Sequence, residues 1–311
     1  MEKFDWTLTI RMNLLTLRTV GLWPSQGYKF DFYTLYALIS MVLLIDGSIL
    51  FQVMHIVFDN LNLESVTGPI FIIVTQSLGS MKIFCFMRNI RTIKGLIDDL
   101  NDELFQPKST TQIDLVSPGL SIWSKTYVTF WVLVSSTVTL WSVFPILDKS
   151  YKDCRLPFLA RYPCDTGASP FYEIAYLHQV AGIYLVAIAS LNIDTLMAAL
   201  MVYIGAQCDI LSDDLRSFQD RQYDFSRMFV RCLKRHKKIL SFAQSSNNSF
   251  TTIVFGQFVT SSATIGLAMF QLTLITGLTG ESYSLIFYIS AVTVQLFLYC
   301  WFGNEAEIKV R

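Results

Sequence analysis

Six long apolar runs constrain this chain more than any other feature. Most reach the roughly 20 apolar residues that an α-helix needs to cross the hydrocarbon core of a bilayer. Only 15% of the 311 residues are charged, whereas a soluble domain carries about a quarter. A membrane β-barrel would instead show short segments of alternating polarity. We therefore predict an all-α, polytopic helical membrane protein with transmembrane helices at about residues 32–58, 66–86, 127–147, 174–206, 250–278 and 283–302.

The distribution of Lys and Arg orients these helices. Basic residues gather before the first apolar run, between the second and third, between the fourth and fifth, and after the sixth. The segments that follow the first and fifth runs contain none. Because cytoplasmic loops carry the excess of positive charge, we predict a cytoplasmic N-terminus. The whole chain then forms one membrane domain (1–311), with a cytoplasmic tail (1–31), an outer loop (148–173) and a cytoplasmic loop or helical extension (207–249).

The N-terminal tail and the cysteines leave alternatives open. The leucines between residues 8 and 17 suit either an interfacial amphipathic turn or a plain cytosolic tail. Cys154 and Cys164 share the outer loop, where a disulfide is permitted. Spacing alone does not fix such a bridge. The other four cysteines fall in or below the membrane, and no Cys/His spacing resembles a zinc site.

Enzyme motifs are absent from the sequence. It contains no Gly-rich phosphate loop, no G-x-S-x-G elbow and no H-E-x-x-H pair. We therefore predict neither catalysis nor a cofactor. The zero net charge gives no indication of nucleic-acid binding.

Ionisable residues inside the apolar runs are the better functional indicators, because burying them in a membrane is costly. Glu173, His55 and Lys82 lie near predicted helix ends, where the side chain can reach the interface. Asp46 and Asp194 lie deeper. Either carboxylate could bond a neighbouring helix or take part in transport or gating.

Two segments carry a family resemblance. Residues 295–305 read Gln-Leu-Phe-Leu-Tyr-Cys-Trp-Phe-Gly-Asn-Glu. The outer loop reads Leu-Pro-Phe at 156–158, Arg-Tyr-Pro-Cys-Asp-Thr at 161–166, Ser-Pro-Phe-Tyr-Glu at 169–173 and His-Gln at 178–179. Together they resemble the insect odorant receptor family, although Cys164 stands where that family often has an aromatic residue.

The resemblance implies a function. A receptor of this kind has seven transmembrane helices and acts as a tuning subunit. It assembles with a shared co-receptor into an odour-gated, non-selective cation channel in the plasma membrane of olfactory sensory neurons. The seventh helix of such a receptor lines the pore. This sequence ends at Arg311, where that helix would begin, so we expect six of seven helices from a fragment or truncated variant.

The resemblance also places the functional surfaces. Subunit contacts would form at the cytoplasmic ends of the later helices, where Tyr299, Trp301 and Phe302 lie. The odorant would bind among the outer halves of the helices, in a pocket of aromatic and apolar side chains with few polar groups. From the helix faces we select Phe71, Val74, Val134, Thr137, Val138, Trp141, Tyr176, Gln179, Val180, Ile183, Met269, Leu272 and Phe287.

Trp141 and Tyr176 are the strongest of these, because each combines a large apolar area with a polar tip. No charged residue dominates the set, so small neutral volatile molecules are the expected ligands.

Three other functions are alternatives to an odorant receptor. A G-protein-coupled receptor requires an outer N-terminus, against the charge distribution. A secondary transporter should show internal repeats with interrupted helices at matching positions, and none is visible. A gustatory receptor shares the expected architecture and differs mainly in ligand class, so it stays the principal alternative.

Overall fold

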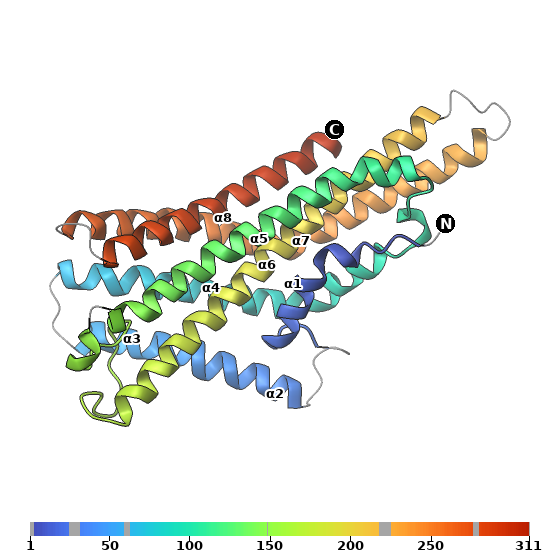
Figure 1. The fold of residues 1–311 in the computed structure, drawn as a ribbon. Coiled ribbons are helices and arrows are strands. Elements are labelled where there is room, and N and C mark those ends of the chain that lie inside the picture. The colour runs from blue at the N-terminus through green and yellow to red at the C-terminus, as the bar shows by residue number, and fades with distance from the viewer. Residues whose placement is uncertain are drawn as a thin grey trace.

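The protein is an elongated bundle of long helices (Figure 1). The computed structural model describes residues 3–24, 32–58, 63–147, 149–217, 225–275 and 280–310. The regular secondary structure in these ranges is all helical, with no strand. The α-helices are α1 (Thr7–Thr19), α2 (Phe32–Ile39), α3 (Gly47–Phe58), α4 (Leu63–Asp99), α5 (Thr110–Leu147), α6 (Phe171–Arg216), α7 (Phe225–Leu274) and α8 (Gly280–Val310). Short 3-10 turns occupy Glu103–Phe105 and Ser150–Asp153.

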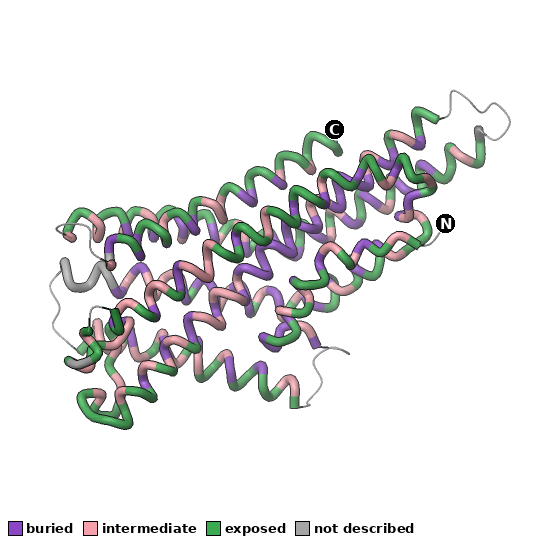
Figure 2. Tube along the Cα trace, viewed as in Figure 1, coloured by how far each residue is buried: buried purple, intermediate pink, exposed green. Residues whose placement is uncertain are grey.

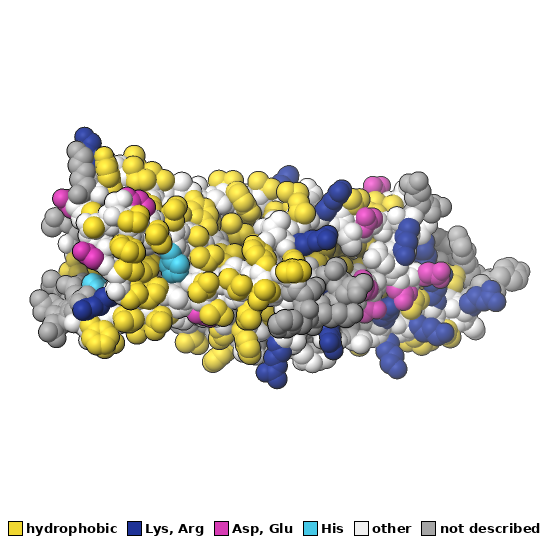
Figure 3. Space-filling view, turned by 90° about the horizontal axis from the view of Figure 1, so that it is seen from below, with side chains coloured by type: hydrophobic (Ala, Val, Ile, Leu, Met, Phe, Trp, Pro, Cys, Tyr) yellow, Lys and Arg dark blue, Asp and Glu magenta, His cyan; other side chains and the backbone are white. Residues whose placement is uncertain are grey.

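Six helical segments among the described residues are long and apolar enough to span a membrane, as predicted. The first combines α2, a π-helical segment (Ser40–Asp46) and α3. Apolar side chains cover much of the surface, while Lys and Arg gather toward the end where the N-terminus lies (Figure 3). That end is called the basic end below. The outer-loop residues 149–170 lie at the opposite end (Figure 1).

Helix α6 is the centre of the bundle. In its most apolar window 67% of the residues are buried, against 28% to 39% in the other five spanning segments. It packs on α1, α4, α5, α7 and α8, and its burial is visible along most of its length (Figure 2). Every site described below therefore has α6 as one wall or lies beside it.

The helices run further toward the basic end than the apolar runs predict. Helix α4 continues to Asp99, well past its apolar run. Helix α7 begins at Phe225, so the described residues from 225 to 249 take the helical alternative predicted for 207–249. The physical reason is amphipathicity: Phe86, Ile90, Ile93 and Ile97 are buried at helical spacing while polar residues between them stay exposed. Residues 276–278 of the fifth predicted helix lie outside the described residues.

Helix α1 is docked on the bundle. Trp6, Ile10 and Leu17 are fully buried. Asn13 donates from Nδ2 to the Asn192 carbonyl at 3.0 Å and to Thr195 Oγ1 at 2.7 Å. The N-terminal segment is therefore a packed helix and not a plain tail.

A buried ionic cluster fastens the basic end. Asp214 on α6 pairs with Lys108 at 2.6 Å and with Arg235 on α7 at 3.2 Å. Gln112 on α5 donates to the same carboxylate at 3.0 Å. Because Asp214 and Arg235 are nearly inaccessible to solvent, this cluster ties α5, α6 and α7 together in a low-dielectric setting.

Candidate functional site

A cavity lies between α4, α5, α6 and α8. Its volume is about 110 Å³. Apolar side chains form most of the wall, with a few polar groups from Thr75, Thr137, Ser190, Tyr288 and Gln295. We call it the inner cavity. Five residues selected from the sequence line it: Val134, Thr137, Val138, Trp141 and Ile183.

Trp141 holds the aromatic wall of this cavity. Its ring stacks on Tyr288 with centroids 5.4 Å apart and meets Phe158 edge-on at 5.7 Å. Phe71 packs at 6.1 Å from Trp141 and 5.3 Å from Tyr288. Offset and edge-on contacts of this kind stabilise aromatic clusters beyond simple area burial. The cluster joins α4, α5, α8 and the outer loop.

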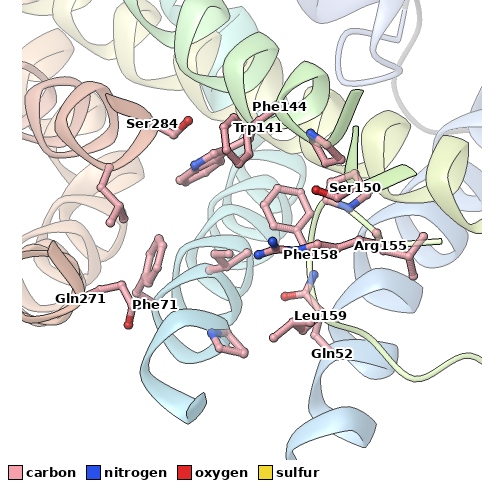
Figure 4. Close-up of a pocket in the computed structure, with 16 residues that line it drawn as sticks. Gln52, Phe71, Trp141, Phe144, Ser150, Arg155, Phe158, Leu159, Gln271 and Ser284 are labelled. Atoms are coloured by element: carbon pink, nitrogen blue, oxygen red, sulfur yellow. The ribbon is translucent and has the colours of Figure 1, made fainter. Parts of the chain in front are cut away.

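A second, larger cavity lies on the outer side of that cluster. Its volume is about 360 Å³, and we call it the outer cavity. In Figure 4 the Phe158 ring lies between Trp141 and Gln52, and Phe71 and Gln271 line another side. Trp141 borders both cavities. It is therefore the partition between the outer cavity and the inner one.

The outer loop is held in place by α6. Gln179 accepts the Phe158 N–H through Oε1 and donates to the Phe158 carbonyl through Nε2, both at 3.0 Å. Tyr162 Oη lies 2.8 Å from His178 Nδ1, and His178 Nε2 lies 2.8 Å from the Leu43 carbonyl. A carbonyl can only accept, so His178 carries its proton on Nε2 and Tyr162 donates to Nδ1.

The Tyr162 hydroxyl stays protonated at physiological pH. Burial raises the pKa of Tyr162 to about 12, because the phenolate would be poorly solvated there. It therefore remains a donor to His178. Helix α6 therefore has two roles. It forms a wall of the inner cavity, and through Gln179 and His178 it holds the outer loop so that Phe158 packs on Trp141.

The other selected residues lie away from the inner cavity. Tyr176 is half-buried and donates to the Ser142 carbonyl. Gln179 bonds the Phe158 backbone through both Oε1 and Nε2. Met269 is 51% exposed and Phe287 is 38% exposed. Of the remainder, Phe71 lines the outer cavity, and Val74, Val180 and Leu272 do not line the inner cavity.

A buried ion pair forms the next layer toward the basic end. Lys82 on α4 reaches both carboxylate oxygens of Asp194 on α6 at 2.9 Å. Tyr299 donates to Asp194 Oδ1 at 2.5 Å, and Gln295 Nε2 donates to Oδ2. The prediction that Lys82 reaches an interface is therefore wrong, because α4 continues past it and buries it. Asp194 takes the helix-to-helix bonding role.

The ion pair also bears on the predicted subunit contacts. Tyr299 and Phe302 are each only 4% exposed and lie inside this chain, so neither side chain faces outward. Trp301 is 46% exposed and packs on Phe297. Of the three residues, Trp301 alone presents a large surface to a neighbour.

Several site residues were missed by sequence reasoning. Thr75, Ser190, Tyr288 and Gln295 all line the inner cavity. A signal existed on α8, where Tyr288, Val292, Gln295 and Tyr299 recur at helical spacing and form one buried stripe. Two of these positions belong to the motif that carried the family resemblance.

Cysteines and acidic groups add no further centre among the described residues. Cys154 and Cys164 are both free thiols, and the Cys154 thiol donates to the Gly167 carbonyl at 3.4 Å. The bridge considered from the sequence is not formed, because the Cys154 thiol is directed to that carbonyl. The described part of the chain holds no group of three or more His, Cys, Asp or Glu suited to a metal ion.

Comparisons with known proteins agree with this architecture. Residues 62–308 match the family model described as the 7tm odorant receptor. Odorant receptor Or1 of Anopheles gambiae is 24% identical over 98% of this chain and 79% of its own length. Odorant receptor 82a of Drosophila melanogaster is 21% identical over 80% of this chain and 69% of its own length.

Solved structures show the same fold. The olfactory receptor OR5 from Machilis hrabei superimposes with a TM-score of 0.83 at 15% identity, covering 98% of this chain and 82% of that receptor. Its complex with eugenol gives a TM-score of 0.83 at 16% identity, covering 97% and 81%. The relatives are receptors and not enzymes. Because the family model spans most of the chain, this multi-pass membrane protein belongs to the insect odorant receptor family.

Proposed function

We propose that this chain binds a small neutral volatile molecule in the inner cavity, as the tuning subunit of an odour-gated cation channel. The shared co-receptor would supply the other subunits, in the plasma membrane of olfactory sensory neurons. The observation that carries the proposal is the cavity wall, which is mostly apolar and includes no charged side chain. A neutral volatile ligand suits such a wall because no buried charge is left unpaired.

Two further facts support this assignment. The outer cavity leads to the aromatic cluster, so a ligand has a place to lodge before Trp141 is displaced. In addition, a structural neighbour was solved with eugenol. Polar groups of the wall come from α4, α5, α6 and α8, and those of Tyr288 and Gln295 on α8 can orient a ligand.

The test is to fill the cavity without disturbing the fold. Ile183→Trp places a large ring where the inner cavity now lies, while Leu177→Trp adds the same ring on the same helix at a site 67% exposed. Each variant is coexpressed with the co-receptor, and odorant-evoked current and surface expression are measured. We expect the first substitution to abolish the response and the second to preserve it.

Three results would contradict the proposal. If Ile183→Trp responds like the parent, the ligand does not occupy the inner cavity. If the parent chain gives no current with any neutral volatile but responds to organic ions, the ligand class is wrong. A current that is independent of the co-receptor would remove the proposed assembly.

A further inference from the structure

A small polar chamber adjoins the inner cavity on the side of α7. Its volume is about 60 Å³. It shares Thr75, Ser190, Tyr288, Val292 and Gln295 with the inner cavity, and adds Lys82, Gln257, Thr260, Ser261 and Thr264. We call it the polar annex. A single water needs roughly 10–15 Å³ of such volume, so a ligand hydroxyl fits.

One buried amide oxygen belongs to a residue that lines the annex and has no partner. Gln257 on α7 is 3% exposed, and its Oε1 accepts no hydrogen bond. Its Nε2 donates to Ser261 Oγ at 2.6 Å and to Gln295 Oε1 at 2.9 Å. A buried acceptor left unpaired is costly. The lone oxygen therefore marks a place where a donor belongs.

The ion pair fixes which atom of Gln257 is left over. Asp194 only accepts, so Gln295 must present Nε2 to it and Oε1 to Gln257. Gln257 must in turn present Nε2 to Gln295, which leaves Oε1 unused. Reversing either amide would set two donors or two acceptors against each other. The Asp194 carboxylate thus determines, through a chain of two hydrogen bonds, that Gln257 has an unpaired acceptor and not an unpaired donor.

The hydroxyl oxygens of Thr75 and Thr260 are acceptors as well. Thr75 and Thr260 donate to carbonyls of their own helices, Phe71 and Gly256, at 2.7 Å each. Since the Thr75 proton is used, Tyr288 must donate to Thr75 at 2.6 Å. These bonds use the hydroxyl protons of Thr75, Thr260 and Tyr288, so these oxygens can only accept a further hydrogen bond.

Lys82 supplies no spare donor. Its three protons are matched by Asp194 Oδ1, Asp194 Oδ2 and Tyr299 Oη at 2.9, 2.9 and 3.4 Å. Its positive charge also lines the annex, so a cationic ligand would meet a like charge in a poorly solvated space. A neutral donor is what remains.

We propose, resting on the proposed function, that the ligands of this receptor are alcohols or phenols, with the hydrocarbon part in the inner cavity and the hydroxyl in the polar annex, donating to Gln257 Oε1. Ethers and esters of the same carbon skeleton lack the proton and leave that oxygen unpaired. The site therefore discriminates between compounds of nearly equal size and volatility by a single O–H group.

The experiment compares matched ligand pairs on the intact chain. Purified protein in nanodiscs is titrated with unbranched alcohols and their methyl ethers, and with phenols and their methyl ethers, by tryptophan fluorescence. Alcohols and phenols should bind about 3- to 10-fold more tightly than their ethers, as expected for one buried hydrogen bond. Equal affinity within every pair would overturn the inference while leaving the odorant-binding proposal intact.

Variants locate the effect. Gln257→Met should reduce the alcohol-to-ether affinity ratio to about one, because the acceptor is removed at similar volume. Gln244→Met makes the same change on the exposed face of the same helix and should preserve the ratio. If Gln257→Met keeps the preference for alcohols, the hydroxyl is bound elsewhere. If no compound in any pair binds the parent, the proposed function itself fails.

Discussion

Lys82 and Asp194 form a two-pronged ion pair in the middle of the bundle, with both side chains only 1% exposed. Each comes from a different helix, and Tyr299 and Gln295 of a third helix complete the carboxylate. Removing one partner of such a pair strands a buried charge, which costs about 3–5 kcal/mol. Replacing both by apolar groups avoids that cost.

The first prediction follows from this asymmetry. Asp194→Asn should lower thermal stability strongly, because the Lys82 ammonium loses its counter-charge. Lys82→Met should cost less, since Asp194 keeps the donors Tyr299 and Gln295. The double variant Lys82→Met/Asp194→Leu should recover much of the loss. Thermal unfolding in nanodiscs gives the order, with Asp46→Asn as an exposed control. A double variant less stable than either single one would refute the argument.

The second prediction concerns the close approach of α6 to the π-helical segment. A Cβ at Gly182 would lie 2.4 Å from the Leu44 carbonyl oxygen, which is backbone and cannot rotate away. Gly182→Ala should therefore destabilise by about 1–3 kcal/mol. Gly266→Ala meets nothing within 4 Å, and should be neutral or stabilising because Ala favours helix. Equal unfolding temperatures for the two variants would contradict this, because they would show that the π-helical segment moves aside without cost.

The third prediction concerns Trp141, the partition between the two cavities. Trp141→Ala in a receptor coexpressed with the co-receptor should raise the half-maximal odorant concentration by about 10-fold or more, because the ligand loses a large aromatic surface. Surface expression should be retained. Trp131→Ala on the same helix removes a ring that is 40% exposed, and should leave the dose response unchanged. An unaltered response in Trp141→Ala would remove that residue from the site.

The fourth prediction is a pH dependence of the outer loop. The folded pKa of Tyr162 is raised from 10.0 to about 12 by burial, so its bond to His178 contributes below pH about 10. That contribution is lost as the pH rises from about 10 to about 12. Phenolate absorbance of the parent minus that of Tyr162→Phe should show one late-titrating group. The control Tyr151→Phe should retain that late step, and its loss there would contradict the assignment.

The fold was largely predictable and the site only partly so. Apolar runs gave the six spanning segments, because length and hydropathy are the quantities that a membrane selects. They failed to give the helix ends near the basic end, where half-buried amphipathic turns replace apolar ones. Lys82 was misplaced for that reason, since it lies near the end of an apolar run but well inside α4.

Partners across helices account for the remaining misses. The helix face of Gln179 predicts a pocket residue, yet both its Oε1 and its Nε2 bond the Phe158 backbone. Tyr299 is predicted to face a neighbouring subunit, yet its hydroxyl donates to the Asp194 carboxylate, 105 positions away in the sequence. Periodicity predicts which face of a helix is buried, but not which side chain from a distant part of the sequence packs against that face. Trp141 and Ile183 do line the inner cavity, where apolar packing decides their position, and their role in ligand binding stays a prediction.

The length of α6 has a mechanical consequence. From Asp194 to its last residue, Arg216, the helix extends roughly 33 Å at about 1.5 Å per residue. A rigid rod of that reach, rotated by about 5° at the ion pair, sweeps its far tip through about 3 Å. Since Asp214 near that tip is bonded to Gln112 of α5 and Arg235 of α7, a rotation of α6 would carry the basic ends of three helices together.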